Sequence, residues 1–288
     1  MDAYGLKIKD YLMHALVAKA YNLSGDCHVS FLAQGEYNKN YMVTEGDSKY
    51  VFRINMGSQL NLKNQIEYEF NAIKKLEKSG VTPTAYFCDD SRTYFEEGIL
   101  MMNYLSGRPL NYETDLEVAA KIFGSIHKLD SSDFRDTLIV EEALCKARLT
   151  EADHWLSSFR ASSAPSVASK RIMEAFYSYC ARNAEAVDAY FREDPWQVVN
   201  NTEVNSHNFI IGEKESFLID WEKPVISEPV QDITQFLAPT TTLWKTDTRL
   251  TDKETDAFFS TYEKIMGRPI KERVKAYEPN VIKLIYII

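Results

Sequence analysis

The chain has 288 residues, with 33 Lys and Arg against 42 Asp and Glu, which gives a formal charge of −9. A content of 26% charged and 45% hydrophobic residues is typical of a globular protein and excludes a disordered or fibrous one. No apolar run reaches the roughly 20 residues of a membrane-spanning helix. The N-terminal segment interrupts its hydrophobic residues with Lys and Asp and has no signal-peptide core. We therefore predict a cytoplasmic protein that is not embedded in a membrane.

The cysteines and the charge balance exclude two further classes of protein. The four cysteines are scattered, with no CxxC pair and no His at metal-ligand spacing, which predicts free thiols and neither a zinc site nor a disulfide framework. Binding to nucleic acid needs a basic stripe that neutralises phosphates, and none is visible. The cysteines are Cys27, Cys88, Cys145 and Cys180.

The first third of the chain has the pattern of a small antiparallel sheet. Three candidate strands follow one another at 28–34 (HVSFLAQ), 40–45 (NYMVTE) and 50–55 (YVFRIN). The connections, a turn at Gly35 and a GDS turn, are too short for a crossover between parallel strands. The segment is therefore predicted to be a three-strand meander.

A helix predicted at about 62–78 carries one unusual residue. At about 100° per residue, the apolar side chains that follow Ile66 fall within one arc, and Glu69 lies inside that arc. A carboxylate on an inward stripe needs a partner, because burying an unpaired charge is costly. The alternative is a half-exposed glutamate at the edge of the stripe.

After two more predicted strands, at 84–88 and 98–105, the chain becomes mostly helical. The tetrapeptide TDLE (Thr114–Glu117) has the pattern of a capping box at the start of a helix that ends in IHKLD. Further helical patterns occupy about 140–192. A sheet-rich part followed by a helix-rich part predicts an α+β protein of two lobes, with the boundary near Ser106.

A predicted hairpin in the second part carries the residues with the clearest chemistry. If NFII (208–211) and FLID (217–220) pair about a central turn, Asn208 lies opposite Asp220, and their oxygen atoms converge at one end. Two oxygen ligands suit Mg²⁺, and Glu203 lies close enough in the sequence to add a second carboxylate. The alternative is structural, since Asn and Asp often occupy the ends of strands because they favour turns.

The order of these motifs resembles the aminoglycoside phosphotransferase/choline kinase family, a branch of the protein-kinase-like fold. The shared features are the meander with its Gly turn, a basic residue on the third strand, the helix with an inward Glu, LMMNYLSGRPL, IHKLD, and E-x4-N followed by IDWE. The resemblance covers about 28–240. It implies a bilobal fold, with a nucleotide-binding lobe over 1–105 and a helical lobe over 106–288 that holds the catalytic-loop hairpin and the acceptor site.

The resemblance also implies a nucleotide site in the first lobe. Gly35 would belong to a loop that covers the phosphates. Arg53 would stand where kinases place the strand lysine that grips the phosphates, and Glu69 would be its partner. The end of the strand at 98–105 would be a hinge whose backbone binds the nucleotide base. The hinge residues are Met102, Asn103 and Leu105.

By the same resemblance, Asn208 and Asp220 would hold Mg²⁺, and Asp232 would brace the catalytic loop from behind. The family's loop usually reads H-G-D-x4-N, whereas this chain has Asn201 for the His and Glu203 for the Asp. Glu203 would then be the catalytic base that orients the acceptor hydroxyl. Glutamate keeps the carboxylate and a similar pKa but adds a methylene, so its reach differs.

Two functional classes are compatible with this combination. The first is a Mg²⁺-dependent kinase that transfers the γ-phosphate of ATP or GTP to a hydroxyl of a small alcohol or aminosugar, and it is favoured by the retained phosphate and metal residues. The second is a nucleotide-binding pseudokinase or regulatory module, favoured by the altered loop. A scaffold that binds no nucleotide is a third. The expected partners are a nucleotide and a small-molecule acceptor, with no nucleic acid and no membrane.

Overall fold

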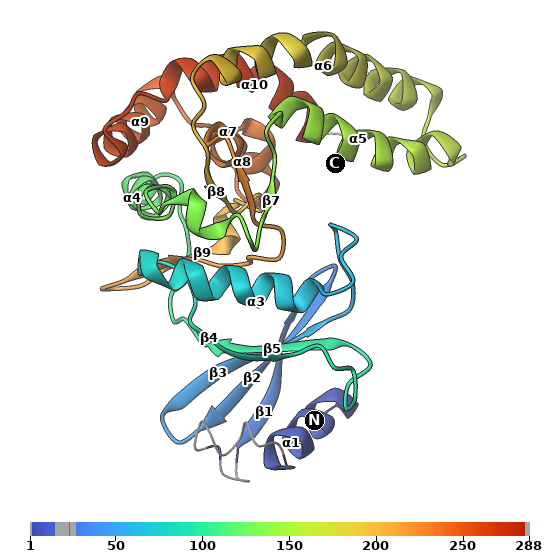
Figure 1. Cartoon of the computed structure of the whole chain (residues 1–288), viewed down its shortest axis with the longest axis vertical. Coiled ribbons are helices and arrows are strands. Elements are labelled where there is room, and N and C mark those ends of the chain that lie inside the picture. Colours follow the sequence, from blue (N-terminus) through green and yellow to red (C-terminus); the bar gives the residue numbers. More distant parts are fainter. Residues whose placement is uncertain (1, 15–22, 24–26, 286–288) are drawn as a thin grey trace. The chain divides into compact units, whose positions relative to one another are not determined.

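The computed structural model describes residues 2–14, 23 and 27–285 of the chain. The segment 15–22, on which part of the signal-peptide interpretation rests, lies outside the described residues. The chain forms two compact units, one of Met1–Gly107 with Phe217–Lys223 and one of Arg108–Ser216 with Pro224–Ile288 (Figure 1). Across the described ranges, no helix is both long and apolar enough to cross a membrane.

The first unit contains a five-stranded sheet in the order β1-β2-β3-β5-β4, and all neighbouring strands run antiparallel. The meander predicted from the sequence is present, although the strand predicted over 98–105 already ends at Asn103. The strands are β1 (His28–Gln34), β2 (Asn38–Glu45), β3 (Ser48–Asn55), β4 (Ala85–Asp89) and β5 (Gly98–Asn103).

The two faces of this sheet have different partners. One face packs against α1 (Ala3–His14), and residues such as Tyr41 and Phe52 join the helix in an apolar core. Next to β4 and β5, in the first unit of Figure 1, runs α3 (Gln65–Leu76), which buries Ile73 with other apolar residues. Because side chains alternate along a strand, the neighbours of Tyr41 and Phe52 point to the face opposite α1.

The second unit is mainly helical. A small sheet, β7-β11-β8, and the antiparallel pair of β6 with β9 lie among its helices. The strands are β6 (Arg108–Pro109), β7 (Ile139–Val140), β8 (Val198–Asn200), β9 (Phe209–Ile211) and β11 (Val225–Ser227). The helices are α4 (Leu116–His127), α5 (Leu144–Ala161), α6 (Val167–Glu193), α7 (Val230–Leu237), α8 (Pro239–Lys245), α9 (Asp252–Met266) and α10 (Lys271–Ile285).

Aromatic rings form the centre of the second unit. Phe236 on α7 contacts the rings of Phe123 on α4, Phe209 on β9 and Phe258 on α9, with ring centroids 5.1–5.8 Å apart. All four side chains are buried. This core fixes the helices around the loop between β8 and β9, which carries Glu203 and Asn208.

The predicted capping box at the start of α4 is wrong. The residue before the helix is Asp115, and the hydroxyl of Thr114 donates to its carboxylate instead of capping the helix. Asp115 also accepts a hydrogen bond from Arg108, at 3.0 Å, while Glu117 pairs with Lys121. The Asp115 carboxylate, bound by Arg108, therefore engages the Thr114 hydroxyl that the sequence pattern assigns to a local cap.

The predicted free cysteines are confirmed. Cys27, Cys145 and Cys180 are buried, Cys88 is partly buried, and none of the four forms a disulfide. Burial raises the pKa of Cys88 and of Cys180 to about 11, so both are protonated thiols at neutral pH.

Candidate active site

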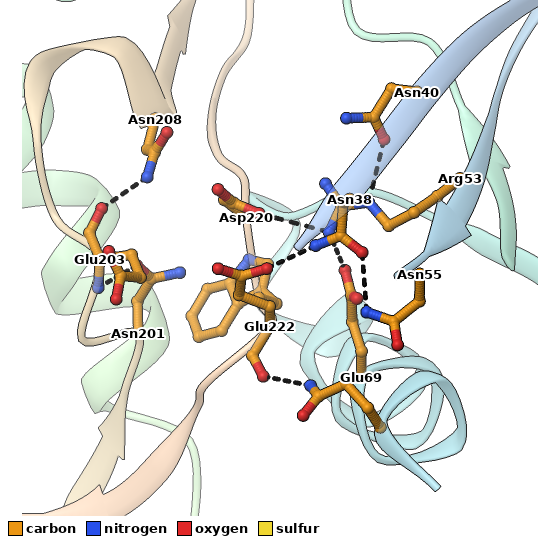
Figure 2. Close-up of polar contacts among 12 residues, drawn as sticks. Asn38, Asn40, Arg53, Asn55, Glu69, Asn201, Glu203, Asn208, Asp220 and Glu222 are labelled. Carbon is orange, nitrogen blue, oxygen red and sulfur yellow. Dashed lines mark hydrogen bonds and ion pairs between the residues drawn. The ribbon is translucent and has the colours of Figure 1, made fainter. Parts of the chain in front are cut away.

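One face of the β2–β3 pair is polar although it is buried. Asn38 lies opposite Asn55, and Asn40 lies opposite Arg53, so all four side chains share a face. Asn38, Arg53 and Asn55 are 4%, 7% and 9% exposed. Buried polar groups need hydrogen-bond partners, so this face requires partners from other elements of the first unit (Figure 2).

Arg53 contacts two carboxylates of the first unit. Its Nε donates to Asn40 Oδ1 at 3.0 Å, and its Nη1 forms ion pairs with Glu69 and, at 3.3 Å, with Asp220. The ion pair predicted between Arg53 and Glu69 is therefore present, and Glu69 is fully buried, not half-exposed at the edge of its stripe.

Burial and ion pairing act against each other in this pair. Burial raises the pKa of Glu69 to about 7, and the positive charge of Arg53 opposes that rise. Burial would lower the pKa of Arg53, but the charges of Glu69 and Asp220 outweigh it and raise that pKa. The guanidinium therefore stays charged at neutral pH.

Asp220 lies in a short segment, residues 217–223, that the first unit holds at several points. Leu218 N–H donates to Val81 O at 2.9 Å, and the fully buried indole of Trp221 donates to Leu218 O at 2.9 Å. The backbone of Asp220 is left-handed, with φ of 63°. Such a conformation is unfavourable for a residue other than Gly and is often found at functional sites.

Glu222, two residues after Asp220, is bound from two sides. Its carboxylate accepts a hydrogen bond from Asn38 Nδ2, and its backbone oxygen accepts one from Gln65 Nε2 at 2.6 Å. Asn38 Oδ1 in turn accepts from Asn55 Nδ2 at 2.9 Å. These residues were not predicted from the sequence, although the alternation of Asn38 and Asn40 on one strand and of Arg53 and Asn55 on the next is a signal for a shared polar face.

The turn at Gly35 is held by backbone hydrogen bonds, one within the turn and one from the residue after β3. Gly35 N–H donates to Asn38 O at 2.9 Å, and Met56 N–H donates to Tyr37 O at 2.7 Å. A Cβ built on Gly35 would have no atom within 4 Å, and its backbone is not left-handed. Nothing in the folding of this turn therefore requires glycine at position 35.

The predicted hinge residues lie at the end of β5. Met102 is buried within the strand. The N–H of Asn103 donates to Thr84 O at 3.0 Å, and the N–H of Thr84 donates to Asn103 Oδ1 at 2.8 Å. The N–H of Tyr104 donates to a carbonyl of β3. No partner for the N–H of Leu105 occurs among the described residues, and its role in a hinge stays a prediction.

The hairpin that the sequence suggested is built differently. Asn208 ends a short 3₁₀ helix (Ser206–Asn208), and Asp220 follows β10 (Ser216–Leu218), so neither residue lies in a strand. The cross-strand pairing by which we placed them together is therefore wrong. Asn208 belongs to the second unit and Asp220 to the first, and the metal pair stays a prediction.

In the second unit, the loop that carries Glu203 is held through its backbone. Asp232 accepts hydrogen bonds from the N–H groups of Asn201 and Thr202, at 2.6 and 2.8 Å. Glu203 N–H donates to Asn201 Oδ1 at 3.0 Å, and Glu203 O accepts from Asn208 Nδ2 at 2.6 Å. These bonds fix the backbone on both sides of the Glu203 side chain (Figure 2).

The support behind this loop extends into the helical core. His127 Nδ1 lies 2.8 Å from the hydroxyl of Tyr262, and His127 Nε2 lies 3.9 Å from Asp232 Oδ2. All three side chains are at most 3% exposed. Asp232 therefore makes the contact that a brace of the loop requires, with the buried histidine packed behind it.

The comparison with known proteins identifies a family. The model of the phosphotransferase enzyme family matches residues 28–277. Among solved structures, the chain is similar to a choline kinase from Cryptosporidium parvum Iowa II, with a TM-score of 0.68, 15% identity, and 98% of this chain and 88% of that chain covered. A search of curated proteins finds no match.

Two further structures share the fold. An ethanolamine kinase from Plasmodium vivax has a TM-score of 0.68 and 16% identity, with 99% of this chain and 83% of that chain covered. A spectinomycin phosphotransferase in complex with ADP and spectinomycin has a TM-score of 0.53 and 14% identity, with 90% of this chain and 92% of that chain covered. These likenesses confirm the predicted α+β, protein-kinase-like fold, and the match of the family model over most of the sequence shows that this chain belongs to the phosphotransferase enzyme family.

Proposed function

We propose that this protein is a Mg²⁺-dependent kinase that transfers the γ-phosphate of ATP or GTP to a hydroxyl of a small molecule. The observation that carries the proposal is the buried guanidinium of Arg53, which contacts both Glu69 and Asp220. A basic strand residue, a helix carboxylate and a metal-binding aspartate are the groups that kinases use to position phosphates. Membership of the phosphotransferase enzyme family supports the same reaction class.

The chemistry of the predicted ligands suits Mg²⁺. The side-chain nitrogen of Asn208 donates to Glu203 O, which leaves the side-chain oxygen of Asn208 outside that bond. Asp220 offers a carboxylate. Within the described ranges, no group of three or more His, Cys, Asp or Glu residues could hold a metal ion. A pair of oxygen ligands completed by phosphate and water suits Mg²⁺, which rarely uses an all-protein cage. Bound there, Mg²⁺ would neutralise charge on the phosphoryl group.

The remaining groups of the proposed nucleotide site come from the first unit. Arg53 supplies a permanent positive charge for the phosphates, and Leu105 has an N–H available for the base. Gly35 lies in a turn where a side chain would meet no neighbour, so we propose that glycine is kept there for close approach of a phosphate.

Glu203 is the proposed acceptor base. The bonds from Asn201, Asn208 and Asp232 hold the backbone of its loop, which fixes the point from which the Glu203 carboxylate reaches the substrate hydroxyl. A positioned base typically contributes about 10²–10⁴-fold to the rate.

Calorimetric titration of ATP and GTP, with and without Mg²⁺, tests the proposal. We expect binding that depends on Mg²⁺, in the micromolar range, or about −8 kcal/mol. The control is Asn71→Asp, which adds one negative charge at an exposed position of α3 and should bind like the wild type. Absence of binding for both nucleotides under both metal conditions would contradict the proposed function.

A nucleotide-binding pseudokinase is the second candidate, favoured by Asn201 and Glu203 at the positions of the family's His and Asp. Turnover separates the two, measured as ADP release with choline, ethanolamine and spectinomycin as trial acceptors. If Glu203 is the base, Glu203→Gln should lower turnover at least about tenfold and leave nucleotide affinity unchanged. A pseudokinase would bind nucleotide without turnover, and Glu203→Asp would be the variant that gains activity.

A further inference from the structure

Asn38 joins three parts of the first unit. Its backbone oxygen accepts from Gly35 N–H and closes the turn between β1 and β2, at 2.9 Å. Its side-chain nitrogen donates to the carboxylate of Glu222, and its side-chain oxygen accepts from Asn55 on β3, at 2.9 Å. Asn38 is 4% exposed, so each of these groups has left water for a specific partner.

Glu222 ties the same turn to the segment that carries Asp220. Only Trp221 separates the two acidic residues, and its indole is fully buried, which restricts movement of the backbone between them. The backbone oxygen of Glu222 is held by Gln65 at the start of α3, and Gln65 accepts in turn from Ser58 at 2.5 Å. The carboxylate of Glu222 therefore presents a fixed negative charge to Asn38.

We propose that Asn38 and Glu222 form a latch that fixes the turn at Gly35 relative to the segment of Asp220. The latch makes Asn38 and Glu222 positioning residues, which act on the nucleotide through Gly35 and Asp220 and do not touch it. This role rests on the proposed function, because Gly35 and Asp220 are its phosphate and metal residues. The physical reason is that a hydrogen bond from a buried amide to a carboxylate is stronger than one between neutral groups and requires one orientation of the amide.

Exchanging the donor and the acceptor of the hydrogen bond between positions 38 and 222 tests the latch. Asn38→Asp keeps the shape and the acceptor for Asn55 but places a second carboxylate against Glu222, so the two side chains repel. Glu222→Gln removes the charge and keeps an oxygen acceptor, so its effect should be smaller than that of Asn38→Asp. In the double variant, the amide nitrogen introduced at position 222 donates to the carboxylate introduced at position 38, which restores the contact with donor and acceptor exchanged.

Two measurements report on the latch. Hydrogen exchange in the nucleotide-free protein follows the N–H group of Gly35, which closes the turn, and that of Met56, which holds the turn residue Tyr37. We expect Asn38→Asp to accelerate both at least about tenfold and the double variant to return them to within about threefold of the wild type. In titrations with MgATP, the single variant should lose at least about tenfold in affinity, and the double variant should recover.

Controls and opposite outcomes separate the latch from the proposed function. Asn71→Asp, with the same change at an exposed site, should alter neither measurement. If Asn38→Asp does not fold, Glu222→Ala removes the carboxylate and keeps the backbone bond to Gln65, and it should accelerate the same two N–H groups. The latch is overturned if neither variant accelerates exchange, or if the double variant is as impaired as Asn38→Asp. If the wild type binds no nucleotide, the proposed function fails, while hydrogen exchange still decides the latch.

Discussion

The two units hold their candidate functional residues by different means. In the first unit, side chains bind side chains: Arg53 pairs with Glu69 and Asp220, and Asn38 with Glu222. In the second unit, side chains bind the backbone of the loop, as Asp232 does with two successive N–H groups. A charged network depends on each side chain in it, whereas a braced backbone tolerates changes of the side chains it carries. The departures from the family's loop, Asn201 and Glu203, lie in the braced backbone.

Asp232→Ala should have the largest effect on stability. It leaves the N–H groups of Asn201 and Thr202 buried without an acceptor, which we expect to lower the free energy of unfolding by about 3–5 kcal/mol. Asp232→Asn keeps the volume and one oxygen, so its loss should be smaller. Urea titration followed by circular dichroism measures both variants. Equal losses for Ala and Asn would show that the charged, two-bond brace is not what holds the loop.

Arg53→Ala tests the charged network and should have a strong dependence on pH. Removing Arg53 leaves the Glu69 carboxyl buried and unpaired, with an expected loss of about 3 kcal/mol at pH 8. The pKa of Glu69, about 7 in the wild type because of burial, should rise further, since the opposing charge is gone.

The sign of this pH dependence follows from the raised pKa. An acid whose pKa is raised by folding contributes stability below its ordinary pKa, near 4.5, and that contribution is lost as the pH rises through the folded value. Arg53→Ala should therefore lose stability more steeply than the wild type between pH 5 and pH 8. Adding Glu69→Gln should remove the extra slope, and a slope that persists in the double variant would assign it to another group.

Thr202 tests whether the braced loop stores strain. Its φ of 71° is unfavourable for any residue with a Cβ, and a β-branched side chain makes it worse. Thr202→Ala and Thr202→Gly both lose the side-chain contacts, but only Gly relieves the backbone. We expect the Gly variant to be more stable than the Ala variant by about 1 kcal/mol in urea titrations. Equal stabilities would mean that the loop leaves this conformation in the Ala variant.

The smallest effect is expected for Asp115→Asn, which removes the charge of a half-exposed ion pair in the second unit. Hydrogen bonds from Arg108, with those from Asn111 and Thr114, lower the pKa of Asp115. A lowered pKa contributes stability above the ordinary value near 3.8 and loses it as the pH falls through the folded value. The difference in urea midpoint between variant and wild type should therefore be visible at pH 7 and shrink as the pH falls below the ordinary value. A loss as large as that of Arg53→Ala would contradict the contrast between this half-exposed pair and the buried pair of Arg53 with Glu69.

Local patterns predicted the elements of the first unit well. Alternation of apolar residues gave β1, β2 and β3, and helical periodicity gave α3 with Glu69 facing inward. These patterns succeed because each depends only on the repeat of the strand or helix and on one apolar face. The assignment to the kinase-like fold came from the order of several motifs and is confirmed.

Patterns that depend on a partner outside the element itself were less reliable. The capping box at Thr114 failed because Arg108 binds Asp115, and the pairing of Asn208 with Asp220 failed because both residues lie outside the strands. Asn38 and Glu222 were missed because their contact joins residues 184 positions apart.

The sequence by itself determined the repeats of strands and helices, the order of motifs that places the chain in its family, and the residue types available for phosphate and metal. Only the tertiary structure decided which of those polar groups are buried together. Burial removes water as the competing partner, so that Arg53 binds Asp220 as well as the predicted Glu69, and Asn38 binds Glu222. That selection depends on the packing of whole elements, which no single stretch of sequence contains.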